Sequence, residues 1–118
     1  MDLEEMMLEF SGLPYKQEIA NNIVYVELVI DNDDLYDWQS RLEKIFGVPL
    51  KPAGVDPDEV IKDITKDYGG VHGGITKDQI LYRRDFDTTA VLVMIWPWER
   101  EPKATLKMFL RQGPGLDL

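Results

Sequence analysis

The stretch Ala90–Trp96, AVLVMIW, decides the fold, because every one of its positions is apolar. Its β-branched and aromatic residues favour a strand, and a strand that is apolar on both sides needs cover on both faces. We therefore expect this stretch to lie inside a sheet, with another strand on either side of it. Pro97 then interrupts the hydrogen-bonded ladder at one end.

The residues before this stretch, from Gln79 to Phe86, alternate between apolar and polar side chains, as in a strand with one solvent-exposed face. Asp87 and Thr88 either form a two-residue turn or belong to a longer bulged loop, since Thr disfavours the positive φ that tight hairpins need. The two-residue turn predicts three pairs across the hairpin: Ile80 with Ile95, Tyr82 with Val93, and Arg84 with Val91.

Three segments repeat apolar residues at helical spacing. Asp33 or Asp34 is expected to cap the second, which Gly47 ends, while Asp56 and Pro57 open the third, which Gly69 ends. The three apolar stripes are Leu3, Met6, Met7 and Phe10; Leu35, Trp38, Leu42 and Ile45; and Val60, Ile61, Ile64 and Tyr68.

Residues 23–30 and 104–110 alternate as strands do. These elements predict an α+β two-layer sandwich, in which an antiparallel sheet of about four strands carries two or three amphipathic helices on one face. The last three strands form a meander, and strand 23–30 joins either of its edges. We expect one domain over residues 1–118, with a flexible tail at 113–118.

Composition narrows the classes of function. The net charge of −9 argues against binding to nucleic acid or to an anionic membrane. The absence of cysteine rules out disulfides and thiolate chemistry, and the acidic start lacks the features of a secretory signal. We expect a soluble cytoplasmic protein without a cofactor.

Two acidic motifs suggest chemistry that their contexts argue against. Residues 85–89, DFDTT, match the D-x-D-x-T pattern of haloacid-dehalogenase-type phosphotransferases, in which the first Asp attacks phosphorus. That motif follows a parallel strand and leads to a helix, whereas here a strand follows, so a hairpin turn is the better interpretation. The acids at 31, 33, 34 and 37 lack the glycine and the glutamate of an EF-hand and are better explained by helix capping than by a metal site.

Two places remain as candidate binding sites. His72, the only histidine, lies in the glycine-rich stretch Gly69–Gly74 and, with Tyr68 and Arg84, is a candidate ligand contact. Trp96-Pro97-Trp98 carries two indoles at a strand end, and Trp98 with Arg100 is a candidate partner contact.

The leading hypothesis is a non-catalytic binding or regulatory module that contacts a basic protein or a second copy of itself as a homodimer. A small-ligand protein or an enzyme using the Gly69–Gly74 loop and His72 is the alternative. A third possibility is an acidic mimic that inhibits a nucleic-acid-binding protein.

Overall fold

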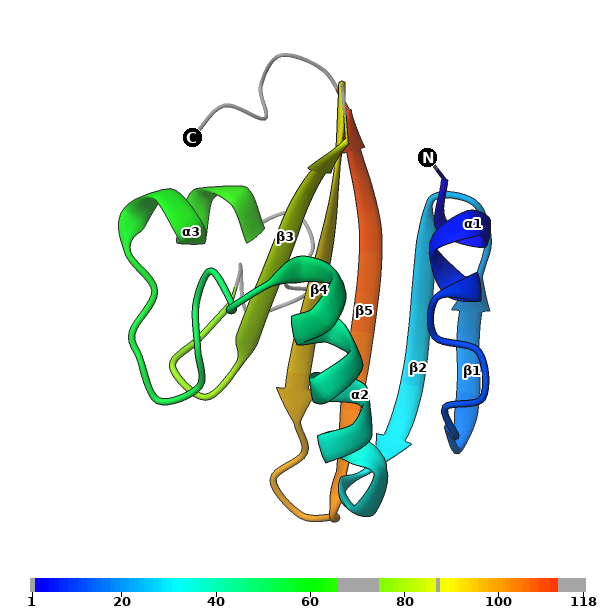
Figure 1. The fold of residues 1–118 in the computed structure, drawn as a ribbon. Coiled ribbons are helices and arrows are strands. Elements are labelled where there is room, and N and C mark those ends of the chain that lie inside the picture. Colours follow the sequence, from blue (N-terminus) through cyan, green and yellow to red (C-terminus); the bar gives the residue numbers. More distant parts are fainter. Residues whose placement is uncertain (1, 66–74, 87, 113–118) are drawn as a thin grey trace.

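A computed structural model describes residues 2–65, 75–86 and 88–112 of the chain. Within these ranges one antiparallel sheet of five strands packs with three helices, which confirms the predicted α+β class (Figure 1). No helix in the described ranges has the length and apolar character needed to cross a membrane. The elements are α1 (Leu3–Leu8), β1 (Gln17–Asn21), β2 (Tyr25–Asp31), α2 (Asn32–Phe46), α3 (Glu59–Thr65), β3 (Ile80–Phe86), β4 (Thr89–Pro97) and β5 (Lys103–Gln112).

The strand order is β1-β2-β5-β4-β3, so β4 lies between its two neighbours in sequence, as predicted. The C-terminal meander is confirmed, and β2 joins it through β5. The β3–β4 register contains all three predicted pairs, and Phe86 opposite Thr89 leaves two residues for the turn. The fifth strand, β1, forms a hairpin with β2 and carries a bulge between Glu18 and Ala20.

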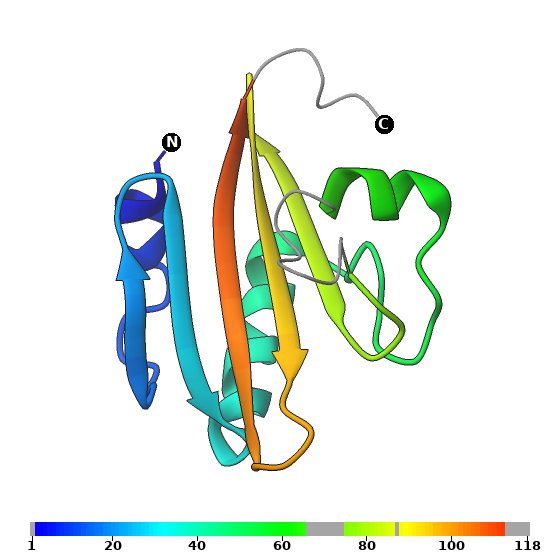
Figure 2. The same ribbon diagram turned by 180° about the vertical axis from the view of Figure 1, so that it is seen from behind.

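Helices α1 and α2 pack on one face of the sheet, as predicted, whereas α3 lies beside β3 (Figures 1 and 2). Leu3 and Met6 of α1 and Trp38 and Leu42 of α2 belong to one buried cluster with alternate residues of β2, β3, β4 and β5. Ile61 and Ile64 of α3 join a second cluster with the intervening residues of β3, β4 and β5. Because Ala90–Trp96 of β4 are all apolar, the sequence of this strand does not specify which face a given helix covers.

Helix α2 starts earlier than predicted, with Asp31 instead of Asp33 or Asp34 at its N-cap. The backbone N–H of Asn32 donates to the Pro102 carbonyl at 2.9 Å, which fixes the first residue of the helix against the loop after β4. Gly47 ends the helix as predicted, with φ at 79° and its N–H bonded to the Glu43 carbonyl.

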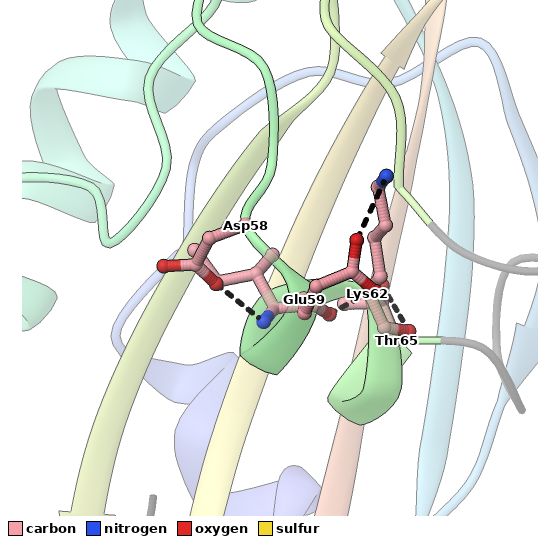
Figure 3. A network of polar contacts seen from close by, with 5 residues as sticks. Asp58, Glu59, Lys62 and Thr65 are labelled. Carbon is pink, nitrogen blue, oxygen red and sulfur yellow. Dashed lines mark hydrogen bonds and ion pairs between the residues drawn. The ribbon is translucent and has the colours of Figure 1, made fainter.

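Helix α3 starts at Glu59, later than the predicted opening at Asp56 and Pro57. Asp58 Oδ1 accepts the Ile61 N–H at 2.8 Å, and Thr65 Oγ1 donates to the Ile61 carbonyl at 2.8 Å (Figure 3). Val60, predicted to be buried, is 50% exposed. Tyr68 and Gly69 lie outside the described residues.

Candidate functional site

Of the three predicted ligand contacts, the structure describes only Arg84. Tyr68, His72 and the rest of the Gly69–Gly74 stretch lie outside the described ranges. Arg84 Nη1 donates to the Ile45 carbonyl at 2.8 Å, and its guanidinium carbon lies 4.9 Å from the centre of the Phe86 ring. A cation at the last turn of α2 is stabilised by the helix dipole.

The two acidic motifs also have structural roles. Asp85 lies in β3, antiparallel to β4, and binds Arg83 Nε at 3.0 Å, so the hairpin interpretation of this motif is supported; Asp87 lies outside the described residues. Asp31 pairs with Lys16 at 3.1 Å, and Asp33 and Asp34 occupy the first turn of α2. In the part of the chain that the structure describes, no three carboxylates or imidazoles gather to hold a metal ion.

Trp98 and Arg100, the predicted partner contacts, do lie together in the β4–β5 loop (residues 98–102). Trp98, Glu99, Arg100 and Glu101 line an open hollow of about 590 Å³, here called the loop hollow. Trp98 is 38% exposed, although its backbone N–H donates to the Lys103 carbonyl at 2.9 Å and its indole Nε1 donates to Thr105 Oγ1 at 2.8 Å. The ring is therefore held in place while part of its surface remains available for contact.

A lysine already lies over this indole. Lys103 Nζ is 5.6 Å from the centre of the Trp98 ring and 3.9 Å from Glu101 Oε2. A cation over an indole is attracted by the negative face of the ring, and a nearby carboxylate adds to that attraction. Sequence reasoning missed Lys103, because its position across the hairpin from Trp98 depends on the loop that joins the two strands.

Exposed acidic side chains lie on the β4–β5 loop and at the start of α2. The hydrogen bond from Asn32 to Pro102 holds the start of α2 against the β4–β5 loop, and Figures 1 and 2 show both segments at the same end of the molecule. Asp33 and Asp37 are exposed on this part of α2, and Glu99 and Glu101 are exposed on the loop. This end of the molecule, called the acidic end below, therefore carries exposed carboxylates on both the loop and the start of α2.

Trp96 lies on the same side of the sheet as Trp98 but is partly buried against the second cluster. Lys107 Nζ lies 4.2 Å from the centre of its ring, and its own Nε1 is buried without a hydrogen-bond partner. Nearby in β2, the Tyr25 hydroxyl donates to Glu27 Oε1 at 2.6 Å, and burial together with this carboxylate raises the pKa of Tyr25. The lysine and tyrosine side chains therefore lie over the part of this face that β2 and β5 form.

Lys51 is the most unusual polar residue in the described ranges, because it is a lysine only 1% exposed to solvent. Its ammonium group donates to the backbone carbonyls of Pro52, Lys77 and Gln79, and its backbone forms a bridge with Leu81 at the edge of β3. Burial lowers the pKa of Lys51, and Asp78 and Asp56 oppose that change.

Three acceptors around the Lys51 nitrogen match the three N–H donors of the charged form, which argues against a role as a nucleophile. Nothing in the sequence marks this residue, since a lysine in a connecting segment is ordinarily solvated.

Comparison with models of protein families, with curated proteins and with solved structures found no match to this chain. The geometry of the described residues is therefore the basis for a functional proposal.

Proposed function

We propose that the chain is a non-catalytic protein-binding module whose contact surface is the loop hollow. The observation that carries this proposal is the partly exposed indole of Trp98 beside an open depression, with one hydrogen bond from the ring and one from the backbone of the same residue. A rigid aromatic side chain loses little conformational entropy on binding, and tryptophan is enriched among the residues that dominate interface energies.

The described groups with shifted pKa values support a binding role more than a catalytic one. Tyr82 is buried in the core, where burial and the charge of Glu43 raise its pKa to about 12 and keep the phenol neutral. Lys51 is saturated by three carbonyls, and Tyr25 donates to Glu27. Each of these groups is already committed to an internal contact.

Affinity capture with matched variants tests the proposal. Immobilised protein, the Trp98→Leu variant and the Ile23→Ser variant are each exposed to extract of the source cells. Ile23 is an exposed apolar residue next to the β1–β2 turn, at the opposite end of the molecule from the loop hollow (Figure 1). Proteins retained by the wild type and by Ile23→Ser but lost by Trp98→Leu support the proposal, whereas identical retention by all three contradicts it.

A second possible partner is another copy of the chain, which would form a homodimer through the edge of β1. The outer edge of β1 pairs with no strand in the described ranges, and Ile19 in this strand is 50% exposed. The bulge at Ile19 opposes this contact, because bulges interrupt the regular row of donors and acceptors that a second strand would need. Sedimentation of the wild type and of Ile19→Lys over a range of concentrations tests it, and a monomer at all concentrations rejects it.

A further inference from the structure

We infer that the loop hollow binds an arginine side chain from a basic segment of a partner protein. This inference rests on the function proposed above and specifies the chemistry of the partner. A guanidinium group is planar and weakly hydrated, so it can stack on an indole while its N–H groups bind carboxylates. The loop hollow offers both features, the indole of Trp98 and the carboxylates of Glu99 and Glu101.

Lys103 provides an intramolecular precedent for a cation at this position. Its ammonium group lies near the Trp98 ring and also pairs with Glu101, so both features of the inferred site already act on one cation. An incoming guanidinium competes with Lys103 for these two contacts. Arg has the advantage in this competition, because its fork of donors can bind a carboxylate through two hydrogen bonds where an ammonium acts as a point charge.

Charge favours a basic partner over a second copy at this surface. The chain carries a net charge of −9, and Asp33, Asp37 and Glu99 at the acidic end have no ion pair among the described residues. Two such ends facing each other would repel, whereas a basic segment is attracted to them and associates faster at low salt. Arg100 and Lys103 are the groups that oppose this attraction.

Fluorescence titration with short synthetic peptides tests the inference. One peptide alternates arginine with glycine, a second has lysine in place of arginine, and a third has glutamine. We expect the arginine peptide to bind most tightly and the glutamine peptide to bind least. Trp98→Leu is expected to weaken arginine-peptide binding roughly fivefold, because it removes one cation–π contact that is partly exposed to solvent.

Charge variants separate the loop hollow from the general acidity of the chain. Glu101→Gln is expected to weaken binding roughly threefold, as for one exposed ion pair. Lys103→Gln is expected to strengthen it about twofold, because a competing cation is removed. Glu4→Gln makes the same charge change on α1, at the opposite end of the molecule, and should alter binding by less than about 1.5-fold at physiological salt, where exposed charges farther apart than about 8 Å are screened.

Three outcomes overturn the inference. Equal losses in Glu4→Gln and Glu101→Gln, with Trp98→Leu unaffected, would indicate only diffuse attraction to an acidic protein. Binding of the glutamine peptide as tightly as the arginine peptide, and loss of both in Trp98→Leu, would retain the loop hollow as a protein contact and reject the basic partner. No binding of the arginine peptide even at low salt would also reject the basic partner. The capture experiment would then still test whether the loop hollow binds another kind of protein.

Discussion

The two faces of the sheet bury their apolar residues by different means. On one face α1 and α2 cover alternate residues of four strands, and their side chains form one continuous cluster. On the other face Ile61 and Ile64 of α3 join a smaller cluster, and Lys107 and Tyr25 lie over β2 and β5. Side-chain packing dominates the first face, whereas polar contacts of Thr65, Lys51 and Lys107 hold the second face and its edge. The two faces should therefore respond differently to substitution.

The largest difference is expected on truncating the central side chain of each helix. Trp38 stacks on Phe10 with ring centres 5.6 Å apart, and its Nε1 donates to the Pro14 carbonyl at 2.7 Å. Trp38→Ala should lower the free energy of unfolding by about 3–5 kcal/mol, because it leaves a large cavity and an unpaired carbonyl. Ile64→Ala in α3 should lower it by about 2–3 kcal/mol. Urea unfolding measures both, and equal losses would contradict the comparison.

Lys51 provides a test of the polar contacts at the edge of β3. Lys51→Met keeps most of the side-chain volume but removes the ammonium donor from the carbonyls of Pro52 and Gln79. The Lys77 carbonyl loses one of its two donors and keeps the Gly54 N–H. The free energy of unfolding should fall by about 2 kcal/mol or more, since unsatisfied buried acceptors are costly. Hydrogen exchange at the Leu81 amide, which bonds the Lys51 carbonyl, should accelerate as well.

Lys77→Met is the matched control for this substitution, because the Lys77 side chain is exposed. If both variants are equally stable, the hydrogen bonds of the Lys51 ammonium do not stabilise the edge of β3.

Alkaline pH should destabilise the core through Tyr82. Burial raises the pKa of this phenol from its ordinary value near 10 to about 12, so the folded chain holds its proton at pH values where the unfolded chain has lost it. The contribution to stability is complete below about pH 10 and is lost as pH rises through about 12, with a total of about 2–3 kcal/mol.

Tyr82→Phe should flatten this decline, as measured by urea unfolding between pH 9 and pH 12, roughly the interval that the two pKa values span. Tyr25, whose pKa is also raised, lies on the other face and accounts for any decline that remains, which Tyr25→Phe should remove. A decline of unchanged size in both variants would show that other groups cause it.

The alternation of apolar and polar residues was enough to predict much of the face that α1 and α2 cover, but little of the opposite face. The β3–β4 register was predictable because a two-residue turn and a period of two fix every pair once the turn is placed. The face covered by α3 was not predictable, since β4 is apolar on both sides and the stripe of α3 fits either. Lys51 was missed because two of its three acceptors, the carbonyls of Lys77 and Gln79, come from residues far along the chain. Trp98 and Arg100 were predicted to make contacts, but the hollow that they line depends on the conformation of the β4–β5 loop.

The smallest effect is expected for the lysine that covers the second face. Lys107→Met keeps an apolar side chain over Trp96 but removes the charge, so the free energy of unfolding should fall by about 0.5–1 kcal/mol. Trp96→Leu and the double variant complete a cycle that separates the cation–π contact from packing. The buried Trp96 Nε1 has no hydrogen-bond partner, so Trp96→Leu also removes an unpaired donor. The free energy of unfolding should therefore fall by less than the loss of buried ring surface alone predicts. A coupling energy near zero would mean that Lys107 covers the ring only through its aliphatic stem.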